Sequence, residues 1–166
     1  TFNEVLTVSA AIDAAESKDE KLALIESQLS DACQIICDIY SRFLFESSVF
    51  EARPQEFLDA DRLCQLMLEA QKKAYGDGLD QSCLHPYMWL CKGHYYSGSL
   101  SFYNFPYAFG GLFARGLYAK YQQEGKDFVP LYKKMLHATS VTCVEDTAKI
   151  AGIDLTDKAF WRQGLQ

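Results

Sequence analysis

Apolar side chains recur at steps of three and four residues along the first part of the chain, which is the pattern of amphipathic helices. The pattern predicts a helix over Thr1–Ala15, where no Gly or Pro interrupts it. Ser17 and Glu20 have the spacing of a capping box and predict the start of a second helix that runs to about Ala52. At about 1.5 Å per residue, that helix would be roughly 50 Å long.

Pro54 fits the first turn of a third helix, because proline is tolerated where a helix has no backbone hydrogen bond to lose. The period of this third helix ends at Gly76-Asp77-Gly78. The first half of the chain should therefore contain a pair of long antiparallel helices. From Leu79 to Phe105 the helical period is lost among aromatic, Gly and Pro residues, so a long loop is expected there.

The helical period returns after this loop. Four further helices are expected: Tyr107–Glu124, ended by Gly125; Asp127–Ala138, with Pro130 in its first turn; one from a cap at Ser140 to Ala151, ended by Gly152; and a last one capped by Thr156. No strand pair and no internal repeat is visible. The sequence therefore predicts an all-α fold, with long antiparallel helices followed by an aromatic Gly/Pro-containing loop and shorter helices, and it predicts that residues 1–166 form a single helical domain.

The composition excludes several classes of protein. The chain has 166 residues, is 49% hydrophobic and carries a formal net charge of −6, so it can bury a core and offers no basic surface for nucleic acid. No apolar run approaches the roughly 20 residues of a membrane span, and no signal-peptide pattern is seen, so we expect no membrane partner and a cytoplasmic location. Six cysteines at irregular spacing favour free structural thiols over disulfides, and Cys33 and Cys37 lack a nearby His to complete a zinc set.

The most distinctive segment runs from His94 to Tyr121, because it is rich in aromatic rings and carries no carboxylate. Asp and Glu are absent between Asp80 and Glu124 although the chain is acidic overall. An ordinary water-facing surface would carry both charge signs. The hydroxyls and rings of this segment are therefore expected to face a core or a ligand pocket.

Several motifs taken in order resemble the C-terminal part of oligoendopeptidase F, a zinc metallopeptidase related to thimet oligopeptidase. They are Arg53-Pro54, Gln71-Lys72-Lys73-Ala74-Tyr75-Gly76-Asp77, Trp89, His94-Tyr95-Tyr96 and Phe102-Tyr103-Asn104-Phe105-Pro106-Tyr107-Ala108-Phe109-Gly110. Thr1-Phe2-Asn3-Glu4 also resembles the segment that follows the third zinc ligand in those enzymes. The resemblance thus extends over nearly the whole chain and is most specific between His94 and Tyr118.

The resemblance implies a catalytic zinc in the intact enzyme, held by a His-Glu-x-x-His helix and a later glutamate. The chain contains no His-Glu-x-x-His, and the glutamate is expected just upstream of Thr1, so no zinc ligand is predicted here and the chain alone should not cleave peptides. Its partners would be an oligopeptide substrate and the missing N-terminal catalytic portion. This chain should then expose large apolar areas that the catalytic portion covers in the intact enzyme.

The site residues implied by the resemblance are few. His94, Tyr103 and Tyr107 would bind substrate and stabilise the oxyanion, and Tyr96 would contribute to substrate binding. Glu4 would orient a zinc-ligand histidine as a hydrogen-bond acceptor. Which tyrosine is the main donor stays open, because Gly110-Gly111 replaces larger residues found in several relatives.

The sequence alone leaves two alternative functions open. The chain could be a stand-alone helical module that binds peptides through its aromatic loop without chemistry. It could also be a thiol enzyme that pairs a cysteine, such as Cys91, with His85 or His94. His137 lies on a helix beside apolar neighbours and is expected to be a surface side chain.

Overall fold

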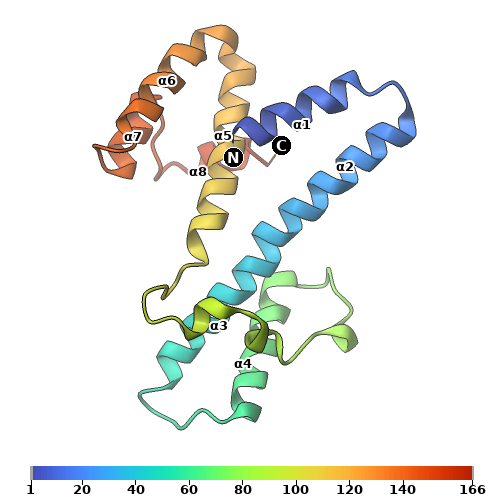
Figure 1. Ribbon diagram of the computed structural model, residues 1–166, viewed down its shortest axis with the longest axis vertical. Coiled ribbons are helices and arrows are strands. Elements are labelled where there is room, and N and C mark those ends of the chain that lie inside the picture. The colour runs from blue at the N-terminus through green and yellow to red at the C-terminus, as the bar shows by residue number, and fades with distance from the viewer. Residues whose placement is uncertain (1, 166) are drawn as a thin grey trace. The chain divides into compact units, whose positions relative to one another are not determined.

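A computed structural model describes residues 2–165 of the chain, and all the regular structure in that range is helical. Eight α-helices follow one another: α1 (Phe2–Ala14), α2 (Lys18–Cys33), α3 (Ile39–Ala52), α4 (Ala60–Tyr75), α5 (Phe105–Glu124), α6 (Phe128–Ala138), α7 (Val144–Ile150) and α8 (Lys158–Gln163) (Figure 1). The predicted all-α class is confirmed.

The described chain divides into two compact units. One contains the residues up to Leu24 together with those from Gly110 onward, and the other is Ile25–Phe109. The boundaries fall inside α2 and α5, so each of these helices begins in one unit and continues in the other. Each unit has its own hydrophobic cluster.

The long helix predicted after Ser17 is present, with one irregularity. The Ser17 hydroxyl accepts a hydrogen bond from the backbone N–H of Glu20 at 3.1 Å, and the Glu20 carboxylate accepts one from the N–H of Glu16, so the capping box forms. Between α2 and α3, a turn of π-helix at Gln34–Asp38 carries the helical backbone on without a break. π-Helix is rare and occurs mostly as single turns inside α-helices.

In the Ile25–Phe109 unit, α3 packs against α4, and the two run antiparallel (Figure 1). Their buried contacts come from four residues, Phe45, Leu66, Met67 and Ala70, against which Leu63, Trp89 and Tyr95 also pack. The helix starting at Pro54 was predicted wrongly. Residues 53–56 prolong the turn at the end of α3, with the N–H groups of Gln55 and Glu56 both bonded to the carbonyl of Ala52.

The helix α4 begins later because Asp59 is its cap. The Asp59 carboxylate accepts a hydrogen bond from the N–H of Arg62 at 2.8 Å, in the position where an acidic residue also complements the helix dipole. The helix ends as predicted at Gly76, whose φ of 57° lies in the left-handed region that glycine tolerates.

The other unit is built around the end of α5 together with α6, α7 and α8. Its buried residues are Leu117, Phe128, Met135, Ala148, Ala151, Ile153 and Phe160. From α1, the ring of Phe2 packs against this cluster and lies 4.5 Å from the ring of Tyr132. The predicted stops at Gly125 and Gly152 are confirmed, and both glycines have positive φ.

Two predicted caps in this unit were wrong. The turn after α6 continues through Ser140, where the N–H of Val141 bonds to the carbonyl of Ala138, so α7 starts only at Val144. The Thr156 hydroxyl and N–H both bond to the Asp154 carboxylate. Asp157 caps α8 instead, accepting from the N–H of Ala159 at 2.8 Å.

The predicted aromatic loop contains three short 3-10 turns, at Gln81–Cys83, Met88–Cys91 and Gly93–Tyr96. The six cysteines are all free, but their burial differs from what we expected. Cys33, Cys83, Cys91 and Cys143 are exposed, and Cys37 and Cys64 are partly buried. Across residues 2–165, no helix has the length and apolar character that crossing a membrane requires.

Candidate functional site

A buried chain of polar groups joins the aromatic loop to α3. The His94 ring, in the 3-10 turn Gly93–Tyr96, has its Nε2 3.1 Å from the Oδ1 of Asn104. The Asn104 Nδ2 donates to the Oε2 of Glu46 in α3 at 3.3 Å. Asn104 and Glu46 are 1% and 6% exposed, so this chain of hydrogen bonds is shielded from water.

Glu46 also holds the loop through its second oxygen. The backbone N–H of Phe102 donates to the Glu46 Oε1 at 2.7 Å. Phe102 has a φ of 56°, a left-handed conformation that costs a non-glycine residue energy and persists where surrounding contacts impose it. Its ring stacks on Phe50 of α3 at 5.0 Å between centroids, which adds a second attachment of the loop to that helix.

The hydrogen bonds to Asn104 determine the proton position on neutral His94. A carboxylate accepts and does not donate, so Glu46 requires the NH₂ side of the Asn104 amide. The amide oxygen therefore faces His94, and the imidazole nitrogen opposite it, Nε2, must carry the proton. Neutral His94 is left with Nδ1 as a hydrogen-bond acceptor.

The predicted site tyrosines follow His94 in a row. The Tyr103 ring lies 6.4 Å from the His94 ring and 5.7 Å from the Tyr107 ring, centroid to centroid. Tyr103 and Tyr107 are 44% and 46% exposed, so both side chains are accessible to solvent. The neighbouring Tyr103 hydroxyl is the main cause that raises the pKa of Tyr107 above its ordinary value. The structure thus brings three predicted site residues together.

The other predicted site residues lie elsewhere. Tyr96 is 62% exposed, and its hydroxyl donates to the carbonyl oxygen of Trp89 at 3.3 Å. Glu4 lies in the first turn of α1, in the other unit, so the structure does not place it relative to His94. Tyr95 belongs to the core: its hydroxyl donates to the carbonyl of Arg42, and burial raises its pKa.

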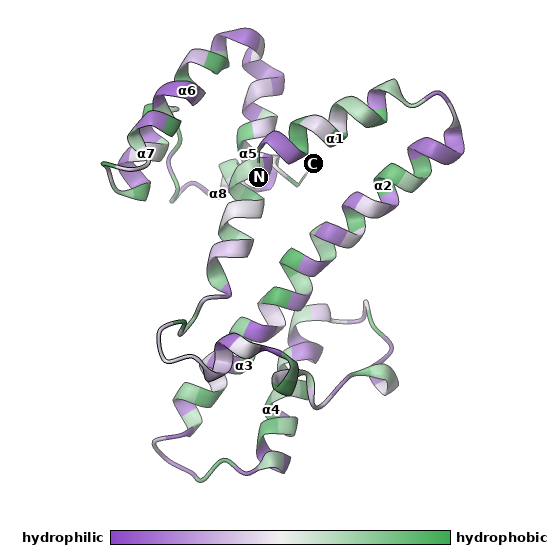
Figure 2. Ribbon diagram, in the orientation of Figure 1, coloured by the Kyte–Doolittle hydropathy of each residue, from purple (hydrophilic) through white to green (hydrophobic). Residues whose placement is uncertain are grey.

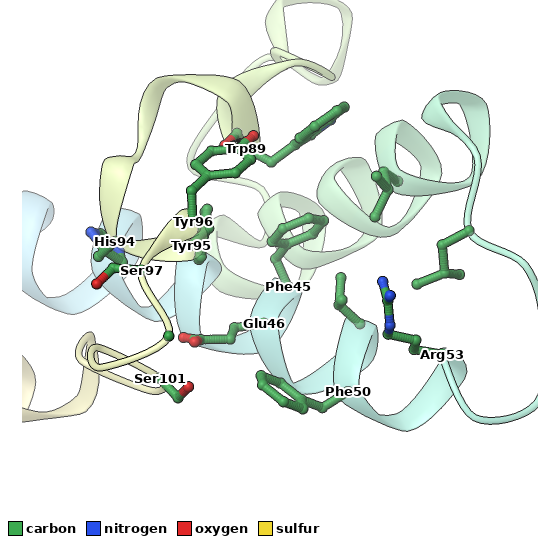
Figure 3. A pocket seen from close by; sticks show the side chains of 14 residues that line it. Phe45, Glu46, Phe50, Arg53, Trp89, His94, Tyr95, Tyr96, Ser97 and Ser101 are labelled. Atoms are coloured by element: carbon green, nitrogen blue, oxygen red, sulfur yellow. Dashed lines mark hydrogen bonds between the residues drawn. The ribbon is translucent and has the colours of Figure 1, made fainter.

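A pocket of about 510 Å³ opens beside this row, a size within the usual range for small-ligand sites. Its walls come from α3, from the start of α4 and from the aromatic loop, all within one unit. The lining is mainly aromatic and aliphatic, and its polar side chains include Glu46, Arg53 and His94 (Figure 3). Tyr96 lines it as well, while Tyr103 and Tyr107 are not among its lining residues.

Sequence reasoning missed Glu46, Asn104 and Arg53 as site residues. The sequence did contain a signal for Glu46, because it is a lone carboxylate directly after the apolar run Phe43-Leu44-Phe45 of the same helix. A buried carboxylate needs hydrogen-bond donors, and here a backbone N–H and an amide supply them. Nothing local indicated that Asn104, 58 residues away, would be one of those donors.

Two further findings bear on the function. Within residues 2–165, no group of three or more His, Cys, Asp or Glu side chains is arranged to hold a metal ion. His85 and His137 are both exposed. Comparison of the chain with protein-family models, with curated proteins and with solved structures finds no match in any of the three.

Proposed function

We propose that this chain is the C-terminal, substrate-binding part of a zinc-dependent oligoendopeptidase of the oligoendopeptidase F type, inactive without its catalytic portion. The observation that carries the proposal is the row of His94, Tyr103 and Tyr107 next to a largely apolar pocket. The family resemblance implies these three residues, and their rings lie next to one another. Zinc ligands would come from the portion that bears His-Glu-x-x-His, which this sequence does not contain.

The geometry suggests different roles for the His94 imidazole and for the Tyr103 and Tyr107 phenols. Neutral His94 offers Nδ1 as an acceptor, which suits the N–H of a bound peptide and not an oxyanion. The tyrosine hydroxyls are donors, and they are exposed where a substrate carbonyl can reach them. In this proposal Tyr103 and Tyr107 stabilise the charge that develops on the scissile carbonyl, and His94 positions the peptide.

The apolar surface of the chain supports a missing partner portion. Neither α1 nor α2 contains a fully buried residue. Leu22 and Leu29 of α2 are 64% and 65% exposed, and Phe57 is 90% exposed. Green turns recur between purple ones along α2 (Figure 2), as expected for a helix with an apolar stripe. Large exposed apolar areas of this kind commonly mark an interaction surface.

In this proposal Glu4 acts only in the assembled enzyme. It lies near the beginning of α1, on the segment that resembles the residues following the third zinc ligand. Its proposed role is to accept a hydrogen bond from a ligand histidine supplied by the catalytic portion. A Glu4→Gln substitution in the assembled enzyme should therefore weaken zinc affinity, measured by competition with a chelator.

The test is to join the chain to the catalytic portion and to assay a quenched fluorescent peptide with and without zinc. We expect zinc-dependent cleavage in the joined protein and none in the chain alone. Tyr103→Phe or Tyr107→Phe should lower kcat by about 10²–10³ if that hydroxyl is the main oxyanion donor. Tyr87→Phe, an exposed tyrosine outside the row, is the matched control. Absence of zinc-dependent cleavage in the joined protein would overturn the proposal.

A stand-alone peptide-binding module is the second candidate, because the pocket is complete within the Ile25–Phe109 unit. Such a module would bind oligopeptides and would never cleave them, whatever portion is joined to it. The cleavage assay therefore separates the two candidates. A thiol enzyme is a weaker proposal, since Cys91 is exposed and forms no hydrogen bond to a histidine within residues 2–165; alkylation of all cysteines should leave cleavage unchanged.

A further inference from the structure

The pocket beside His94 has opposite charges on its two sides. Arg53, from the end of α3, lies on the side away from His94, and Glu46 directs its carboxylate toward the His94 and Ser101 side (Figure 3). Both oxygens of Glu46 already accept hydrogen bonds, from Phe102 and Asn104. The Arg53 guanidinium forms no ion pair or hydrogen bond with any residue between 2 and 165. The pocket therefore keeps one cation available for a ligand.

The walls between these two sides are apolar. They are formed by Phe45, Val49, Phe50, Leu58, Leu63, Trp89 and Tyr95. Burial of a large apolar side chain among such groups is favourable. The lining thus combines a site for a bulky apolar group with a single site for an anion.

The anion that suits this arrangement is a carboxylate. The planar fork of an arginine matches the two oxygens of a carboxylate, and such pairs are stronger than neutral hydrogen bonds. No Lys and no second Arg lines the pocket, and Glu46 would repel a more highly charged group such as a phosphate. A singly charged ligand with its carboxylate at Arg53 and its apolar part between the rings satisfies all of these groups.

We propose that this pocket binds the C-terminal residue of a peptide, with a large apolar side chain among the aromatic rings and the terminal carboxylate on Arg53. The peptide nature of the ligand rests on the proposed function. The bound chain would then run from Arg53 toward His94, so cleavage near the His94–Tyr107 row would release short C-terminal fragments. The enzyme would prefer substrates with a free C-terminus that ends in an apolar residue.

The experiment measures binding to this chain by isothermal titration, so it needs neither zinc nor cleavage. The probes are Ala-Ala-Phe, its C-terminal amide, Ala-Ala-Asp and 3-phenylpropionate. We expect Ala-Ala-Phe to bind and its amide to bind about tenfold more weakly, the size expected for loss of one charge-assisted hydrogen-bonded pair. Ala-Ala-Asp should also bind more weakly, because it keeps the carboxylate and lacks the apolar side chain. Arg53→Gln should weaken Ala-Ala-Phe by a similar factor and should leave the amide unchanged.

Arg53 is exposed, so the variant should fold, and thermal melting verifies this. Arg62→Gln is the matched control, because Arg62 pairs with Glu56 outside the pocket and its loss should leave all affinities unchanged. Equal binding of acid and amide, or of wild type and Arg53→Gln, would overturn the proposal. If 3-phenylpropionate bound as tightly as the tripeptide, the pocket would accept any small amphipathic carboxylate, and the assignment to a peptide end would be wrong.

The outcomes also separate this inference from the proposed function. If binding depends on the carboxylate but the joined protein shows no zinc-dependent cleavage, the C-terminal binding site is supported and the peptidase function is rejected. If the joined protein cleaves amidated and free-acid substrates equally well, the peptidase function is supported and the binding of a free C-terminus in this pocket is rejected.

Discussion

The Nε2 of His94 lies 3.1 Å from the Oδ1 of Asn104, and this contact sets the chemistry of the imidazole. Asn104 cannot turn its amide over, because its Nδ2 donates to Glu46. A carboxylate in α3 therefore controls the proton position of a histidine in the aromatic loop, through one buried amide. The same carboxylate holds the N–H of Phe102, so loop conformation and histidine tautomer depend on one residue.

The first prediction concerns the His94 tautomer. Neutral His94 should carry its proton on Nε2, with Nδ1 unprotonated, and ¹⁵N chemical shifts of the imidazole measure this directly. Asn104→Leu removes the acceptor that selects this tautomer, so the shifts of His94 should move toward those of a mixture. His85 is the internal control, since its Nδ1 accepts from the N–H of Tyr87 far along the loop from Asn104. A protonated Nδ1 in neutral wild-type His94 would contradict the arrangement.

The second prediction concerns the stability that Glu46 contributes. In Glu46→Gln, an NH₂ group replaces one of the two acceptor oxygens and must face an N–H donor, of Phe102 or of Asn104. Leaving buried donors unpaired costs about 1–3 kcal/mol, so the free energy of unfolding in urea should fall by that amount. Glu51→Gln, at an exposed position on the same helix, should change it by less than about 0.5 kcal/mol. Equal effects of the two substitutions would show that the Glu46 bonds do not hold the loop.

Much of the fold follows from local signals in the sequence. The stops at Gly76, Gly125 and Gly152 were predictable because only glycine adopts positive φ at little cost, and the Ser17 cap because its spacing to Glu20 is specific. These signals involve residues within one turn of each other. Tertiary context is not needed to interpret them.

One wrong prediction arose where two adjacent residues competed for the same cap, and another where a turn ran on past the expected helix start. Thr156 and Asp157 are both good capping residues, and the outcome depends on the hydrogen bonds from Thr156 to Asp154. At Pro54, the end of α3 ran on through the proline, and the stronger cap at Asp59 began α4. Propensity alone does not decide between neighbouring candidates of similar strength.

The candidate site was predictable only in part. The row of His94, Tyr103 and Tyr107 was expected from the family resemblance, and its members also lie close together in sequence. The residues that fix the row come from α3, more than 40 positions earlier, as does Arg53 of the pocket. Pairings across that separation depend on how α3 meets the loop, which no local pattern encodes.

The third prediction is a shift in the titration of Tyr107. Its pKa is raised above the ordinary 10.0, chiefly by hydrogen bonding with Tyr103, with burial and the charge of Tyr103 as lesser causes. Tyr103→Phe removes the partner hydroxyl, so the pKa of Tyr107 should fall toward its ordinary value, measured from the ¹³Cζ shift of labelled tyrosine. Tyr87→Phe serves as the control and should leave the pKa of Tyr107 unchanged.

The sign of the associated pH effect follows from linkage. A pKa raised in the folded state means that the folded protein holds the proton more tightly than the unfolded chain. The contribution of this hydrogen bond to stability is therefore complete below pH 10 and is lost as the pH rises through the folded pKa of Tyr107. Tyr103→Phe should show a smaller loss of stability above pH 10 than the wild type. A larger loss would contradict the proposal that Tyr103 raises the pKa of Tyr107.

The last prediction compares two glycines of α5. A Cβ added at Gly116 would lie 2.6 Å from the Cε2 of Phe160 in α8, whereas one added at Gly110 meets nothing within 4 Å. Gly110→Ala should raise the free energy of unfolding by about 0.5–1 kcal/mol, because alanine is the better helix former. Gly116→Ala gains the same propensity but must displace a buried ring, at a cost of about 1–3 kcal/mol, so it should destabilise the protein overall. Urea unfolding of both variants measures the difference, and stabilisation by Gly116→Ala would show that α8 does not pack against α5 at this position.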